Sequence, residues 1–282
     1  MGYLFMITSA FFFCLMTVFV KIAGNNLPTI QIVFIRGLIT LFFTFIVIRR
    51  KNIYLWGSNH SLLIMRGFFG TFALFFVYES IQRFTLFEAT VIQYLFPIFT
   101  AIFASIIISE NIGFKLVFSI LLGLVGVFII LSFPFINQAK NYNMTSTLIA
   151  IVGALLTGFS YVLVRLSSIR GESPYVIMFY FPLFTVPLSF PFSYYSWVNP
   201  SLEMWIILLF LGLSTQLGQT FLTHGYKLLP ASKAAPVSYI QVPLSVIFGS
   251  IIFAEQVSYN FIVGSIIIFF AILIIMQSRD ET

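Results

Sequence analysis

The chain has 282 residues, of which 60% are hydrophobic and 8% are charged, and its mean hydropathy is +1.06. An ordinary soluble domain is about 25% charged, so this composition indicates an integral membrane protein and excludes a typical soluble fold. The formal net charge of +6 does not indicate nucleic-acid binding, because the basic residues lie at the ends of apolar segments and form no stripe.

Ten apolar segments follow one another, each near the roughly 20 residues that a helix needs to cross a bilayer. We expect transmembrane helices at about 3–22, 29–48, 61–80, 87–109, 114–133, 146–166, 174–193, 204–225, 233–254 and 258–277. The first segment is long and uniformly apolar, and no basic region precedes it, so we interpret it as a helix and not as a cleaved signal peptide. The predicted fold class is an all-α integral membrane protein.

A phrase of nine residues occurs twice, as IFASIIISE at 102–110 and as IFGSIIFAE at 247–255. The copies end the fourth and the ninth predicted helices, which are five helices apart, and this odd number means that the second half crosses the membrane in the opposite direction. Inverted repeats of this kind are typical of transporters. We therefore predict two inverted five-helix repeats, at 1–134 and 146–282, joined by a linker at 135–145.

The basic residues predict the orientation, because Lys and Arg concentrate on the cytoplasmic side of a membrane. If the N-terminus is cytoplasmic, nine basic residues fall on that side and three, Lys21, Arg83 and Lys140, fall on the other. We expect a multi-pass protein of a bacterial inner (plasma) membrane with both termini in the cytoplasm.

Polar side chains in membrane helices are costly unless they face protein or water, so polar faces mark the interior of the bundle. The eighth segment has the clearest face, with five polar residues that begin at Gln216 and end at Lys227. The alternative is that these groups only bond neighbouring helices to one another. The candidate substrate-binding residues on such faces are Thr17, Gln93, Tyr94, Tyr161, Gln216, Gln219, Thr223, Tyr239 and Gln241.

Two charged residues inside predicted helices add to these candidates. Arg36 lies roughly 10 Å below the membrane surface, too deep to reach water easily, and is the best candidate for binding an anionic group. The alternative for Arg36 is pairing with backbone carbonyls. Glu79 lies near the outer end of the third segment, where its carboxylate either reaches water or takes part in proton coupling.

Candidate gating residues lie near the helix ends and at two prolines. Lys21 and Arg165 occupy corresponding positions in the two halves and act either in gating or as topology anchors. Pro97 and Pro243 lie beside polar faces, and we expect each to kink its helix. Glu110 ends the fourth segment, where we expect it to cap the next helix.

Enzyme chemistry lacks the residues it needs. Aspartate clusters are absent, since Asp280 is the single Asp, and the two histidines, His60 and His224, have no serine motif beside them. The single cysteine, Cys14, excludes an internal disulfide and a cysteine-based metal site. No P-loop is present, so ATP does not drive this chain directly. We predict no enzymatic activity, no cofactor and no metal.

Several segments resemble the EamA-type half of the drug/metabolite transporter superfamily. They are TSAFFFCLMTVFVKIAG, FIRGLITLFF, MRGFFGTFALFFVYESIQRF and FEATVIQYLFPIFTAIFASIIISE in the first half, and ASKAAPVSYIQVPLSVIFGSIIFAE in the second. The resemblance covers the whole chain. It implies ten helices in two inverted repeats, a central cavity, and alternating access for a small organic solute that is often exported.

The prediction is therefore a secondary transporter, an exporter, of a small organic metabolite. Arg36, with Lys21 and Arg66, makes the helical interior cationic and favours a substrate with a carboxylate, such as an amino acid or a derivative. One alternative is a cationic substrate, a quaternary ammonium compound or a sulfonium cofactor of the S-adenosylmethionine type, held by Glu79 and an aromatic box of Tyr78, Tyr161 and Tyr239. Another is a membrane scaffold or a flippase-like lipid handler. Transport direction, coupling to a proton or other ion, and oligomeric state stay open.

Overall fold

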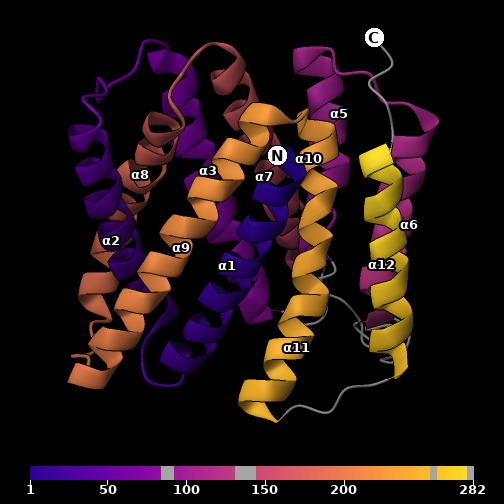
Figure 1. The fold of residues 1–282 in the computed structure, drawn as a ribbon. Coiled ribbons are helices and arrows are strands. Elements are labelled where there is room, and N and C mark those ends of the chain that lie inside the picture. Colours follow the sequence, from indigo (N-terminus) through magenta and orange to yellow (C-terminus); the bar gives the residue numbers. More distant parts are fainter. Residues whose placement is uncertain (84–91, 131–143, 255–258, 278–282) are drawn as a thin grey trace. The chain divides into compact units, whose positions relative to one another are not determined.

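A computed structural model describes residues 1–83, 92–130, 144–254 and 259–277 (Figure 1). Helices joined by short connections make up the described part, which contains no strand. Its elements are α1 (Gly2–Gly24), α2 (Thr29–Arg50), α3 (His60–Arg83), α5 (Phe96–Ile108), α6 (Phe114–Ile130), α7 (Met144–Ile169), α8 (Pro174–Tyr195), α9 (Leu202–Leu228), α10 (Ala231–Val237), the 3-10 turn η1 (Ser238–Ile240), α11 (Gln241–Phe253) and α12 (Tyr259–Gln277).

The prediction of ten apolar helices is confirmed in the described residues. Eight helical segments are long and apolar enough to cross a membrane, with α10, η1 and α11 forming one of them, and α5 and α6 are shorter apolar helices. The predicted fourth helix began at about residue 87, and its residues up to 91 lie outside the described part, as does most of the predicted linker. Large apolar side chains such as Phe42, Ile106 and Ile251 are exposed, as expected for helices that face lipid.

The two copies of the nine-residue phrase end in the same backbone conformation. Ser109 and Ala254, which follow α5 and α11, are both left-handed, with φ of 58° and 53°. Their backbone N–H groups donate to the carbonyls of Ala104 and Gly249, which are equivalent positions of the phrase. The repeat seen in the sequence is therefore also a repeat of local structure.

The helices form two compact units. Unit 1 comprises Met1–Thr71 and Leu163–Leu228, and unit 2 comprises Phe72–Val162 and Leu229–Thr282. Each unit therefore combines helices from both halves of the sequence. The predicted repeats, 1–134 and 146–282, are instead each continuous in the sequence, and this division of the chain stays a prediction.

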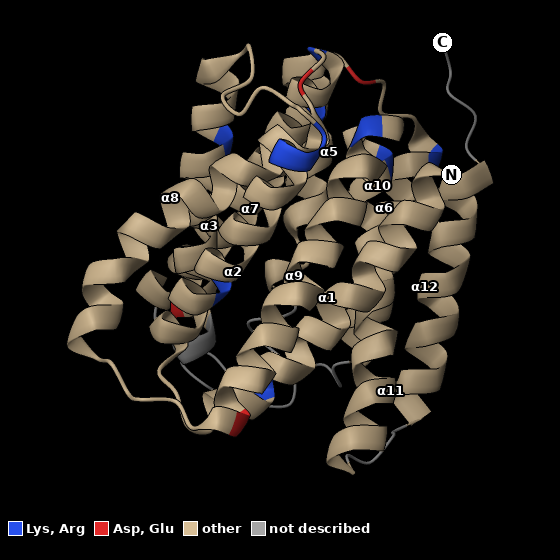
Figure 2. Cartoon of the chain, turned by 60° about the vertical axis from the view of Figure 1, so that its left-hand side comes forward, with Lys and Arg blue, Asp and Glu red and all other residues tan. Residues whose placement is uncertain are grey.

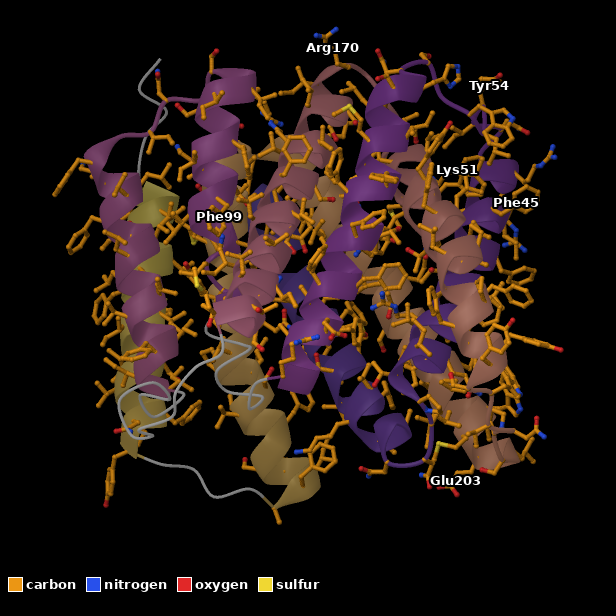
Figure 3. All side chains as sticks on the ribbon, turned by 180° about the vertical axis from the view of Figure 1, so that it is seen from behind. Phe45, Lys51, Tyr54, Phe99, Arg170 and Glu203 are labelled. Atoms are coloured by element: carbon orange, nitrogen blue, oxygen red, sulfur yellow. The ribbon has the colours of Figure 1, made fainter. Side chains whose placement is uncertain are left out.

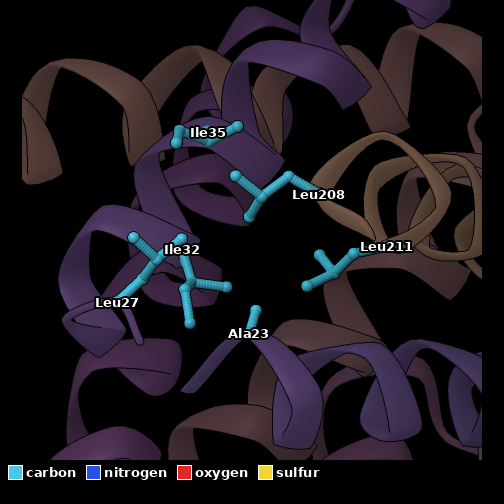
Figure 4. Packing of buried hydrophobic residues seen from close by; sticks show 6 residues of the cluster. All are labelled: Ala23, Leu27, Ile32, Ile35, Leu208 and Leu211. Atoms are coloured by element: carbon cyan, nitrogen blue, oxygen red, sulfur yellow. The ribbon is translucent and has the colours of Figure 1, made fainter. Parts of the chain in front are cut away.

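The core of unit 1 joins α1, α2 and α9. Its centre is an apolar cluster of Ala23, Leu27, Ile32, Ile35, Leu208 and Leu211 (Figure 4). Farther along, the Ser9 hydroxyl donates to the Gly218 carbonyl at 2.8 Å. A Cβ atom at Gly218 would lie 2.9 Å from the Phe13 ring, so glycine lets α1 lie this close to α9.

Two buried polar side chains fasten the loops of unit 1. Gln31 pairs with both backbone groups of Val198, accepting from its N–H at 3.0 Å and donating to its carbonyl at 2.7 Å. Glu172, which is 5% exposed, accepts from the backbone N–H groups of Ser58 and Asn59 just before α3. Each satisfies backbone groups that a membrane protein cannot leave unpaired.

Unit 2 is held by close helix contacts and by Glu110. Gly126 of α6 and Gly264 of α12 face each other so closely that a Cβ at Gly264 would lie 2.6 Å from the Gly126 carbonyl oxygen. The Glu110 carboxylate accepts from the backbone N–H groups of Ala231 and Ser232 at 2.8 and 3.0 Å. Glu110 is thus a helix cap as predicted, but the prediction of the next helix was wrong, because the capped helix is α10, 121 positions away.

Both gating prolines lie where an α-helix restarts. Pro97 is in the first turn of α5, and Pro243 is in the first turn of α11, directly after η1. A proline in the first turn leaves no intrahelical bond broken, because the first N–H groups have no partner within the helix. The regular α-helix is thus interrupted just before Pro97 and just before Pro243. A gating role for these two prolines stays a prediction.

Candidate functional site

Arg36 is a buried cation in unit 1. It is the eighth residue of α2 and its exposure is 6%. Its Nη1 donates to the Met16 sulfur at 3.7 Å, and a thioether is a weak, uncharged acceptor. Among the described residues no carboxylate pairs with this guanidinium. A buried charge costs free energy unless an opposite charge compensates it, so this arrangement is one that an anion would stabilise.

Arg36 lines a small cavity inside unit 1, together with residues of three helices. The lining residues are Arg36, Gly37 and Thr40 of α2, Met178, Phe181, Pro182 and Thr185 of α8, and Thr215, Gln216 and Gln219 of α9. The free space is about 10 Å³, close to the minimum for one water molecule. A metabolite therefore enters this site only when α2, α8 and α9 move apart.

The polar face of α9 is used in two ways. The Gln216 carbonyl oxygen accepts from the Thr44 hydroxyl of α2 at 3.0 Å, which is a bond between helices. The hydroxyls of Thr220 and Thr223 donate to the carbonyls of Gln216 and Gln219 in their own helix, at 2.7 and 2.8 Å. Hydrogen bonds within one helix do not join helices, so of these three bonds only the one between Thr44 and Gln216 links α9 to a neighbour.

The remaining candidates of unit 1 lie away from the cavity lining. Thr17 is exposed and donates to the Phe13 carbonyl at 2.9 Å, and Lys21 is exposed at the end of α1. The Arg165 Nη1 donates to the carbonyls of Tyr226 and Lys227, at 3.1 and 2.8 Å, in the last turn of α9. Arg165 thus satisfies carbonyls that the end of a helix leaves without intrahelical donors.

Besides Glu79, five substrate-binding candidates lie in unit 2, and three of them form an aromatic cluster. The rings of Tyr94 and Tyr239 are 5.7 Å apart, and Phe96 lies between Tyr94, at 6.1 Å, and Tyr161, at 5.4 Å. Tyr239 is fully buried and its hydroxyl donates to the Tyr94 carbonyl at 3.3 Å. The other two candidates are Gln93, which donates to the Thr157 hydroxyl at 3.2 Å, and Gln241, which is partly buried in the first turn of α11.

Glu79 is paired. Its carboxylate accepts from Arg83 one helical turn later, with 2.7 Å between Arg83 Nη2 and Glu79 Oε1, and its side chain is 44% exposed. A partly exposed pair of this kind is a local surface interaction. Its charge is already compensated by Arg83.

The charged residues of unit 1 lie mostly at helix ends (Figure 2). Arg170, Lys51 and Tyr54 lie at one end of the unit and Glu203 at the other (Figure 3). This distribution agrees with a basic cytoplasmic end, and the orientation of the termini stays a prediction.

Sequence reasoning missed most of the cavity wall. Thr40 of the wall follows Arg36 at i+4, and Thr44, which bonds to Gln216, follows at i+8, so the polar face of α2 was a signal that could have identified Thr40. Phe181 and Pro182 of α8 gave no such signal, because apolar residues lie on every face of this helix and the sequence does not distinguish one face from another. Which face of α8 meets Arg36 is decided by tertiary packing.

Comparison with known proteins supports a transporter. The sequence model of the EamA-like transporter family matches residues 1–132 and 144–277. A pseudopaline exporter of Pseudomonas aeruginosa is 25% identical over 279 residues, covering 99% of this chain and 96% of that protein. A riboflavin transporter of Brucella anthropi is 25% identical, covering 92% and 91%. An S-adenosylmethionine uptake transporter of Rickettsia bellii is 27% identical, covering 93% and 88%.

A solved crystal structure has the same fold. The TM-score is 0.84 at 17% sequence identity, over 97% of this chain and 95% of the other. The likeness at this identity establishes the fold alone.

Proposed function

We propose that this chain is a secondary transporter that exports a small organic metabolite with a carboxylate, such as an amino acid or a derivative. The chain belongs to the EamA-like transporter family, whose members are transporters and not enzymes. It is a multi-pass membrane protein of a family with bacterial relatives. Export is supported by the pseudopaline exporter, which matches 99% of the chain. Alternating access is supported by the repeated halves.

The observation that carries the proposal is Arg36. Arg36 is buried, lines the same cavity as Gln216 and Gln219 and, among the described residues, has no carboxylate partner. A carboxylate forms short, charge-assisted and often bidentate hydrogen bonds with a guanidinium. A substrate carboxylate would supply the negative charge that the site lacks.

A cationic substrate is the second candidate, and it is supported by the S-adenosylmethionine uptake transporters among the relatives. In this reading Glu79 and the tyrosines hold the positive group. The pairing of Glu79 with Arg83 counts against it, since that carboxylate would have to leave a partner of its own chain.

A thermal-shift screen of the purified protein tests the proposal. A ligand that binds only the folded form stabilises it, by about 2.7 kcal/mol at a hundredfold excess over its Kd. We expect stabilisation by carboxylates in the wild type and in Arg49→Ala, a matched control at the exposed end of α2, and none in Arg36→Ala. Stabilisation by organic cations that disappears in Glu79→Gln would instead support the second candidate.

A further inference from the structure

The described part of the chain has no carboxylate available beside Arg36. Glu79 pairs with Arg83, Glu110 caps α10, and Glu172 accepts backbone N–H groups ahead of α3. Glu203, in the first turn of α9, is exposed at the end of unit 1 opposite Arg170 (Figure 3). None of the four lines the cavity.

A second buried cation adds to the positive field. Arg66 is 3% exposed, and its guanidinium lies 4.8 Å from the centre of the ring of Phe181, which lines the cavity. Charges act over longer range inside a protein than in water, so Arg66 favours an anion at Arg36 and disfavours a second positive charge there.

The cavity's hydroxyls do not provide free donors. Thr40, Thr185 and Thr215 donate to the carbonyls four residues earlier in their own helices, at 3.0, 3.0 and 2.8 Å. The amides differ. The Gln216 oxygen is engaged by Thr44, a residue outside the lining, and its Nε2 group therefore remains as a donor.

The cavity lining also includes a residue whose carbonyl is a neutral acceptor. Pro182 has no N–H, so the carbonyl of Met178, four residues earlier, receives no hydrogen bond from it within α8. Both residues line the cavity. A backbone carbonyl accepts an amide N–H readily, but it does not neutralise a full positive charge.

We infer that the Arg36 site binds a net anion in preference to a free α-amino acid. In this anion the group next to the carboxylate is uncharged, as in an N-acylated amino acid or a 2-oxo acid. A net anion compensates the charge of Arg36 when it binds, whereas a zwitterion brings its own positive charge and leaves the net charge of the site unchanged. An N-acyl group also presents a carbonyl to the Gln216 amide. This inference rests on the proposed function and narrows its substrate class.

Matched ligand sets test the inference on the full chain in detergent. For glycine, leucine and phenylalanine, the free amino acid, its N-acetyl form and its 2-oxo acid are titrated and the Kd values compared by calorimetry. Within the set that binds most tightly, we expect the N-acetyl or 2-oxo form to bind at least tenfold more tightly than the free amino acid. Gln216→Glu adds a carboxylate next to Arg36 and should shift this ratio at least tenfold toward the free amino acid. Gln277→Glu, the same change at the exposed end of α12, should leave the ratio unchanged.

The outcomes separate the two proposals. Binding of free amino acids as tight as that of their N-acetyl and 2-oxo forms, with binding lost in Arg36→Ala, overturns the inference and leaves the proposed function standing. Unchanged binding of carboxylates in Arg36→Ala overturns both. A panel in which nothing binds also contradicts both.

Discussion

Arg36→Met should make the ligand-free protein more stable while it removes carboxylate binding. Methionine is unbranched and long enough to fill much of the space of the arginine side chain. Arg36 is 6% exposed, and the substitution removes a guanidinium that, in the described residues, is bonded only to the Met16 sulfur. Little favourable interaction is lost, and the cost of burying a charge disappears.

The size of the effect follows from that burial. Replacing a buried ion pair with apolar residues of similar volume is often neutral or stabilises by about 1–4 kcal/mol, and a buried charge without its partner costs the fold more than a paired one. The weak bond to Met16 offsets this by less than the roughly 1 kcal/mol of an ordinary hydrogen bond. Each kcal/mol corresponds to a Tm change of about 2–4 °C for domains of 150–250 residues, so a rise of about 2 °C or more is expected.

The assay is thermal unfolding in detergent, with and without a carboxylate that stabilises the wild type. We expect Arg36→Met to unfold at a higher temperature than the wild type without ligand and to show no further rise with it. Arg49→Met, at an exposed position of the same helix, should keep both wild-type values. A Tm several degrees below the wild type in Arg36→Met would mean that Arg36 stabilises the fold, and the argument for an anion site would fail.

Other substitutions test the packing on which the site depends. Glu110→Ala leaves the first backbone N–H groups of α10 without their acceptor and should destabilise the protein by about 2–4 kcal/mol, with a smaller loss in Glu110→Gln; equal Tm values for all three proteins would refute the cap. Arg165→Ala should speed hydrogen exchange in the last turn of α9, measured by mass spectrometry, and cost about 1–2 kcal/mol; wild-type exchange there would show that the bonds are unimportant. Gly264→Ala forces α12 away from the Gly126 carbonyl and should cost about 1–3 kcal/mol, whereas Gly24→Ala meets no atom within 4 Å and should not; similar Tm values for the two would contradict the close contact.

The sequence was enough to predict the helices, because hydrophobicity over about 20 residues reports directly on membrane insertion. The repeat was also readable, and the left-handed residues Ser109 and Ala254 end its two copies alike. Arg36 was identifiable for the same reason, since a charge deep in an apolar helix is costly wherever the helix packs.

The partners of these residues were not readable from the sequence. Glu110 was expected to cap the helix that follows it, yet α10 lies far along the chain. The candidate tyrosines of unit 2 form a cluster of their own, and all the residues that line the Arg36 cavity belong to unit 1. One-dimensional polarity marks which face of a helix avoids lipid, but which polar faces meet depends on packing between residues that are distant in sequence.

Transport by reconstituted protein tests the central claim most directly. Proteoliposomes are loaded with a labelled carboxylate that stabilises the wild type, and its release is followed over time. We predict release at least tenfold faster from liposomes with wild-type protein or Arg49→Ala than from protein-free liposomes, and release at the protein-free rate with Arg36→Ala. Release from Arg36→Ala liposomes as fast as from the wild type would contradict a carboxylate transporter that binds its substrate through Arg36.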